Sequence, residues 1–216
     1  AEVKLMRGKD LIFEGKLDVI YGQYYYTPLR FISNAPDGYS RAWYRGKCEK
    51  EYQDMLRHGT TMVTLNIGEL PAGDKKWRLN FDQFEEYIAM NRRYGFLSPL
   101  PLGFPAGSLY WKRMKGSWGP HINNVAPQPQ DYFDDITAMV AEIEAERVKR
   151  KWPELLYYPV DEPSTTPTAV AFMVDMMKAI KKVPGVRTYV TADPDHEGFA
   201  PLKPYVDIWC CQPYSL

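Results

Sequence analysis

The sequence predicts an α/β fold, and more specifically a (β/α)8 (TIM-type) barrel of which about six strand-helix units are present. Three observations lead to this prediction. Strand-like and helix-like segments alternate along the chain, a polar residue or a proline follows each expected strand, and the strands are short apolar runs typical of a parallel sheet covered on both faces. Such alternation indicates parallel strands joined by crossover helices. A complete barrel takes about 250 residues, whereas this chain has 216.

The chain divides into a lead-in segment, residues 1–16, and a barrel domain, residues 17–216. Each expected strand in the barrel domain is an apolar or β-branched run that ends at a turn residue. The expected strands are residues 17–26, 60–66, 96–104, 154–163, 186–192 and 206–212. Apolar residues at helical spacing predict helices over residues 44–58, 80–94, 131–151 and 168–182. Residues 105–130 are expected to be a long connection, and connections of this length are usually functional.

Composition argues against several classes of partner. Lys and Arg together number 27, as do Asp and Glu, so no excess charge favours a nucleic acid or an anionic membrane surface. No apolar run approaches the length of about 20 residues that a membrane span needs. Three cysteines and three histidines support neither a disulfide framework nor a zinc site, and we expect no metal and no cofactor.

An open, doubly wound sheet is the competing fold. No Gly-rich phosphate loop follows the first expected strand, which argues against a nucleotide-binding version of that sheet. In a barrel, the carboxyl ends of all strands share one face, and Asn66, Glu162, Asp193 and Gln212 fall at such ends. With about two units lacking, an exposed strand would remain at the edge. A missing domain or a second chain would close it, unless the sequence is a fragment.

The adjacent acids Asp161 and Glu162, at the end of an apolar strand and before Pro163, are the strongest functional signal. Burying charge at such a strand end is costly unless the charge is used. Cleavage of a glycoside needs an acid for the leaving oxygen and a second group that stabilises the developing positive centre. Two neighbouring carboxyl groups titrate as a pair, in which one ionises while the other keeps its proton. The structural alternative is an Asp that caps the next helix and a solvated Glu.

Further residues at strand ends or in the long connection are candidates for binding a sugar, because polar groups bind hydroxyls and aromatic rings stack on the apolar face of a pyranose. These candidates are Tyr24, Asn66, Trp111, Trp118, Asp193, Gln212 and Tyr214. Structural roles account equally well for several of them. Asp193 precedes a proline, as turn residues do, and the two tryptophans could pack beneath the connection.

The strand that ends in Asp161-Glu162-Pro163 resembles the fourth barrel strand of family 123 of the glycoside hydrolases, which contains bacterial β-N-acetylgalactosaminidases. Residues 206–209 and Gln212-Pro213 also fit the pattern of that family. The resemblance implies a hydrolase for 2-acetamido sugars such as N-acetylgalactosamine, with a retaining, substrate-assisted mechanism. It implies that Glu162 is the general acid and base. Asp161 would orient the acetamido group and stabilise the oxazolinium-like intermediate. A secreted or periplasmic location would suit this activity.

Two alternatives stay open. A retaining glycosidase with two carboxylates would also use Glu162 as its acid, with a nucleophile on a later strand. Such enzymes carry Asn before the acid, so Asp161 counts against this alternative. The other alternative is a barrel fragment that binds glycans without cleaving them. A truncated structural fragment is the remaining possibility. The partner that we expect is a carbohydrate substrate.

Overall fold

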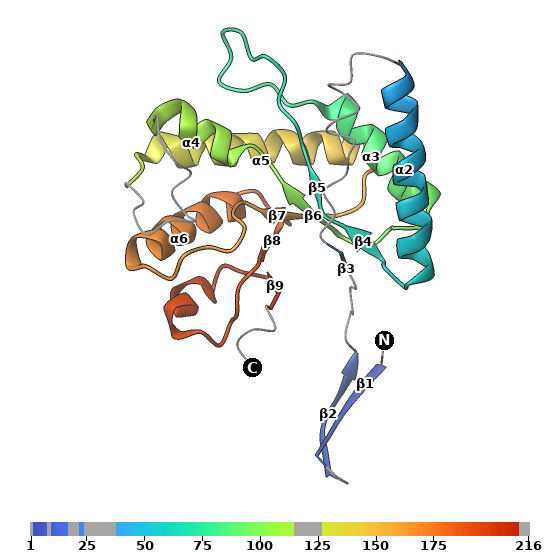
Figure 1. The fold of residues 1–216 in the computed structure, drawn as a ribbon. Helices are drawn as coiled ribbons and strands as arrows, with labels where there is room; N and C mark the ends of the chain where they lie inside the picture. The colour runs from blue at the N-terminus through green and yellow to red at the C-terminus, as the bar shows by residue number, and fades with distance from the viewer. Residues whose placement is uncertain (1, 8–9, 17–21, 24–37, 115–126, 212–216) are drawn as a thin grey trace.

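The structure, a computed structural model, describes residues 2–7, 10–16, 22–23, 38–114 and 127–211, with side chains in the ranges 46–110 and 127–211. It is an α/β protein built on a parallel sheet of five strands (Figure 1). These strands are β5 (Leu65–Asn66), β6 (Leu100–Gly103), β7 (Leu155–Tyr158), β8 (Arg187–Val190) and β9 (Ile208–Trp209). The helices are α2 (Gly38–Arg57), α3 (Phe81–Arg93), α4 (Ala106–Met114), α5 (Gln130–Arg150), α6 (Pro167–Lys181) and the 3-10 helix η2 (Glu197–Leu202).

The five strands lie side by side in the order in which they occur along the chain, β5-β6-β7-β8-β9. All four pairings are parallel, with Leu102 opposite Tyr157 and Tyr157 opposite Thr188. Just before β5, strand β4 (Met62–Val63) pairs in parallel with β3 (Gly22–Gln23). The parallel sheet that the alternating pattern predicts is therefore confirmed.

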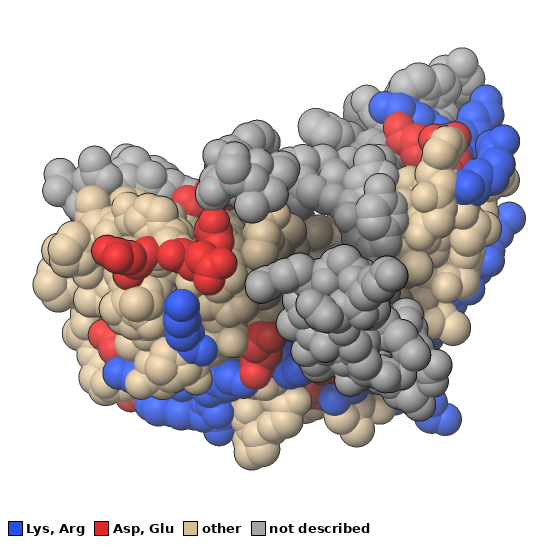
Figure 2. Space-filling model, turned by 90° about the horizontal axis from the view of Figure 1, so that it is seen from below, with Lys and Arg blue, Asp and Glu red and all other residues tan. Residues whose placement is uncertain are grey.

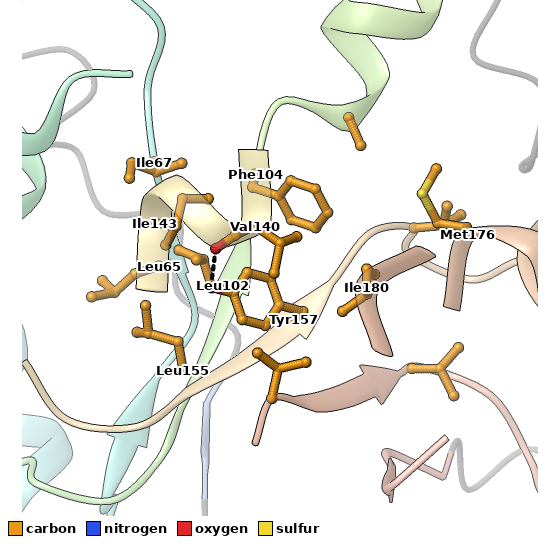
Figure 3. Packing of buried hydrophobic residues seen from close by; sticks show 14 of the residues in the cluster. Leu65, Ile67, Leu102, Phe104, Val140, Ile143, Leu155, Tyr157, Met176 and Ile180 are labelled. Carbon is orange, nitrogen blue, oxygen red and sulfur yellow. Dashed lines mark hydrogen bonds between the residues drawn. The ribbon is translucent and has the colours of Figure 1, made fainter. Parts of the chain in front are cut away.

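The helices pack against one face of the sheet, where they form the main core. Side chains along β7 alternate between the two faces, as expected for a strand. Leu155 and Tyr157 point into this core, whereas Leu156 and Tyr158 join a smaller buried cluster on the opposite face. Figure 3 shows Tyr157 directed toward α5, where its hydroxyl oxygen lies 3.5 Å from the Val140 carbonyl oxygen. Burying such a side chain contributes about 1.5–3 kcal/mol.

Local sequence signals explain where the helices begin and end. The Asn80 side chain caps α3 by accepting a hydrogen bond from the Gln83 N–H at 3.1 Å. Gly95, with a φ of +77°, follows that helix in the left-handed conformation that glycine adopts readily. Pro167 occupies the first turn of α6, where its missing N–H costs nothing. The predicted helices over residues 80–94, 131–151 and 168–182 are confirmed to within about two residues at each end.

Three sequence expectations need correction. The strands are shorter than predicted, and the one expected over residues 60–66 is divided at Thr64 into β4 and β5. The expected connection 105–130 contains helix α4. The helix expected over residues 44–58 begins earlier, because α2 already starts at Gly38. Within the lead-in segment, β1 (Glu2–Arg7) and β2 (Asp10–Lys16) pair as an antiparallel hairpin. The expected strand 17–26 is described only at β3.

Surface charge is mixed. The face of the molecule in Figure 2 carries both acidic and basic side chains, and neither sign covers it. This distribution agrees with the equal totals of 27 acidic and 27 basic residues. Among the helices in the described ranges, none has the length and apolar character to cross a membrane.

Candidate active site

Asp161 and Glu162 lie just beyond the carboxyl end of β7, in the segment that leads to α6. Thr191 lies just beyond the carboxyl end of the neighbouring strand β8. Because β7 and β8 are parallel, these two strand ends meet at the same edge of the sheet. The sequence-based expectation that these acids lie at the carboxyl edge of a parallel sheet is therefore confirmed.

A network of hydroxyl groups holds the Asp161 carboxylate. Its Oδ1 atom accepts hydrogen bonds from the Tyr158 hydroxyl and, at 2.9 Å, from Thr191 Oγ1. The Tyr158 and Thr191 hydroxyl oxygens themselves lie 3.0 Å apart. Hydrogen bonds to a carboxylate are stronger than those between neutral groups. The side chain is therefore held in one orientation, with Oδ1 turned toward the protein.

Glu162 has an unusual backbone conformation. Its φ of +42° lies on the left-handed side of the map, which among described non-glycine residues is otherwise found only at Lys151. For residues other than glycine this conformation costs about 1–2 kcal/mol. The Glu162 N–H donates to Thr191 Oγ1 at 2.8 Å, and the residue is exposed. Backbone strain of this kind concentrates at functional sites, so it favours a role for Glu162 beyond stability.

Two tyrosines, one on β7 and one on β8, pack against each other near Asp161. The Tyr158 and Tyr189 rings meet edge to face with centroids 5.1 Å apart, and both belong to the smaller buried cluster. Burial raises the pKa of Tyr189 well above its ordinary range, and a hydrogen bond with Cys210 and the negative charge of Asp161 act in the same direction. Tyr189 therefore stays neutral, and it offers the site an apolar ring rather than a second anion.

Asn66 ends β5 at the same edge of the sheet and is exposed. Its side chain crosses Gly103, since a Cβ atom at that position would lie 1.9 Å from Asn66 Oδ1. One strand, β6, separates Asn66 from the strand that carries the acids. Two strand spacings are about 10 Å, a distance that one sugar ring with its substituents can bridge.

Of the other predicted binding residues, the structure describes the side chain of Asp193. Asp193 Oδ1 accepts a hydrogen bond from the Asp195 N–H at 2.9 Å, which is the turn role that the Asp-Pro pair indicated. Trp111 belongs to α4, but its side chain is outside the described residues. The remaining candidates are outside the described residues altogether: Tyr24, Trp118, Gln212 and Tyr214.

Sequence reasoning missed Tyr158 and Thr191, the two hydroxyl donors. The rule that polar residues follow strands would have selected Thr191 if the strand had been ended at Val190 rather than at Ala192. Tyr158 lies within an apolar run, but the hydroxyl of a buried tyrosine usually has a hydrogen-bond partner, and this is the signal that points to it.

Among the described residues, no group of side chains forms a metal site, and a hollow lies away from the carboxyl edge of the sheet. Over the described ranges, no three His, Cys, Asp or Glu side chains are grouped so that they could hold a metal ion. A hollow of about 480 Å³ is lined by residues that precede β4 and β6, among them Thr61 and Phe96, so it lies toward the amino edge of the sheet. That hollow does not touch the acids.

Comparison with known proteins adds no assignment. No protein-family model matches the chain, and a search of the curated proteins gives no match. The resemblance to glycoside hydrolase family 123 therefore rests on the sequence around Asp161 and Glu162 alone.

Proposed function

We propose that the protein is a glycoside hydrolase for 2-acetamido sugars, with Glu162 as general acid and base and Asp161 as the group that orients the acetamido substituent. The observation that carries this proposal is the arrangement of the two acids. Asp161 uses Oδ1 for the hydroxyl groups of the protein, and Glu162 stands beside it on a strained, exposed backbone position. The site thus offers one immobilised carboxylate and one accessible carboxyl group at the end of a parallel strand.

We further propose that the sheet is part of a (β/α)8 barrel. Doubly wound sheets change direction at a switch point, where strands that are sequential in the chain are no longer neighbours. Strands β5 to β9 instead follow one another in chain order, and the helices share one face. Both features suit a barrel wall. Closure of such a barrel would need a further segment or a second chain beside the edge strand.

In this mechanism the acetamido oxygen of the substrate attacks the anomeric carbon while Glu162 gives its proton to the leaving oxygen. Asp161 Oδ2 accepts the acetamido N–H and stabilises the positive charge of the oxazolinium ion that forms. Glu162, now a carboxylate, then takes a proton from a water molecule. The water oxygen attacks the anomeric carbon and opens the oxazolinium ring. The configuration is retained, and Glu162 regains its proton.

The test compares aryl 2-acetamido-2-deoxy-β-galactoside with the plain aryl β-galactoside. We expect release of the aryl alcohol from the first and not from the second. Glu162→Gln should lower turnover by about 100-fold or more on substrates with poor leaving groups, because general acid catalysis contributes about 10²–10⁴-fold. Asp175→Asn is the matched control, since Asp175 is a half-exposed carboxylate on α6, whose ion-pair contact with Lys178 is long, at 3.8 Å.

Two outcomes would contradict the proposal. Equal turnover of both substrates would remove the role of the acetamido group. Binding of an N-acetylgalactosamine thiazoline by wild-type protein without hydrolysis of any glycoside would instead support the glycan-binding alternative, in which these strand ends recognise a sugar without cleaving it.

A further inference from the structure

We infer that Thr191 is a positioning residue that fixes Asp161 and Glu162 relative to each other. This inference rests on the proposed glycosidase function. Its hydroxyl contacts both of them. Thr191 Oγ1 lies 2.9 Å from Asp161 Oδ1 and 2.8 Å from the Glu162 backbone nitrogen. Thr191 comes from β8, whereas the acids follow β7, so the neighbouring strand determines where they lie.

The hydrogen-bonding capacity of a hydroxyl group suits this double contact. A threonine hydroxyl has one proton to donate and two lone pairs that accept. Thr191 donates its proton to the Asp161 carboxylate and accepts the N–H of Glu162. One oxygen atom therefore connects the side chain of the first acid to the backbone of the second. Valine has the same shape but can do neither, whereas serine can do both.

The contact with Glu162 also explains how its backbone conformation persists. A φ of +42° is unfavourable for glutamate, so surrounding contacts have to hold it. The hydrogen bond from its N–H to Thr191 is such a contact, and it acts on the residue whose side chain must reach the leaving oxygen. Without this hydrogen bond, we expect φ of Glu162 to return to negative values, which turns its carboxyl group away from the substrate.

The contact with Asp161 determines which of its oxygens faces the substrate. Tyr158 and Thr191 both donate to Oδ1, which directs Oδ2 away from the two hydroxyls. In the proposed mechanism Oδ2 receives the acetamido N–H. Loss of the Thr191 hydroxyl would therefore slow the chemical step and leave binding of the rest of the sugar unchanged. Loss of a residue that only binds substrate would instead weaken binding.

The experiment compares Thr191→Val, Thr191→Ser and Thr137→Val in the full chain. Thr137, on α5, is the matched control because it is also half-buried, and its hydroxyl donates to the Ala179 carbonyl at 2.9 Å rather than to either acid. Crystal structures and kinetics on the aryl 2-acetamido glycoside are measured together. We expect Thr191→Val to lower kcat by about 10–100-fold with KM within about threefold, as misplacement of a reacting group does.

The same structures should show Glu162 φ outside the left-handed region in Thr191→Val, whereas Thr191→Ser keeps the wild-type backbone and most of kcat. Thr137→Val should keep both. If both acids stay in place and kcat is unchanged in Thr191→Val, the inference is overturned. A wild-type protein without glycosidase activity overturns the proposed function instead, and the crystal structure of Thr191→Val still decides whether Thr191 positions the acids.

Discussion

Replacing Glu162 by glycine should stabilise the protein while abolishing its proposed activity. The φ of Glu162 is +42°, and glycine reaches this region without the clash between Cβ and the carbonyl oxygen that other residues meet. The hydrogen bond from the backbone N–H of residue 162 to Thr191 Oγ1 does not involve the glutamate side chain and would remain. The variant thus removes backbone strain and the general acid together.

The size of the effect follows from two opposing contributions. Relief of the left-handed conformation is worth about 1–2 kcal/mol, while the extra freedom of glycine in the unfolded chain costs about 0.5–1 kcal/mol. Because the Glu162 side chain is exposed, its removal adds little to either contribution. We therefore expect the free energy of unfolding to rise by about 0.5–1 kcal/mol, or Tm by about 1–4 °C for a chain of this size.

Urea unfolding followed by circular dichroism measures this difference, and two variants serve as controls. Lys151→Gly removes the other left-handed non-glycine residue of the described chain, at the end of α5, with a φ of +56°. It should stabilise by a similar amount without affecting turnover. Glu162→Ala keeps the strained backbone and should give no gain. If Lys151→Gly is stabilised but Glu162→Gly is destabilised, the argument that function maintains strain at this position is wrong.

Two further predictions concern the core and the edge of the sheet. Tyr157→Phe should lower the free energy of unfolding by about 1 kcal/mol, because burial raises the pKa of Tyr157 and its protonated hydroxyl donates to Glu144 at 3.0 Å; an unchanged urea midpoint would contradict this. Burial tends to raise the pKa of Asp207, but hydrogen bonds from Lys181 and Thr188 outweigh it and lower the pKa below its ordinary value. A carboxyl group whose pKa is lower in the folded state stabilises that state at pH values above its ordinary pKa. This stabilisation is lost as the pH falls through the folded-state pKa. Asp207→Asn should therefore cost about 1 kcal/mol at pH 7 and progressively less below about pH 4, and an equal cost at pH 7 and pH 3 in urea titrations would refute the assignment.

Sequence patterns located helices α3, α5 and α6 well because the signals for their ends are local. Asn80 caps α3 through a hydrogen bond to a residue three positions away, and Gly95 ends it through its own backbone conformation. Neither depends on the rest of the fold. Helix α4 lies inside the connection that the sequence predicts to begin at Pro105. A proline just before a helix is compatible with its first turn, and the Pro105 carbonyl accepts the Leu109 N–H at 3.1 Å.

Strand ends were predicted less well because the apolar residues continue beyond the last residue that pairs with a neighbouring strand. Val160 is buried in the main core, yet β7 ends at Tyr158. The burial of Val160 comes from packing over the strand end, which a sequence pattern cannot separate from pairing. For the same reason the sequence predicts a fifth strand that continues to Ala192, with Thr191 inside it, whereas β8 ends at Val190.

The two acids were predictable, but their partners were not, because partnership depends on the order and register of the strands. Tyr158 meets Tyr189 only because β7 and β8 are neighbours with Tyr157 opposite Thr188. A shift of one residue would turn the side chains of one strand to the other face. In a doubly wound sheet, a strand that follows in sequence need not be adjacent in space. The contact of Thr191 with both acids is therefore a consequence of the sequential strand order, which makes the architecture of the sheet part of the chemistry proposed for its edge.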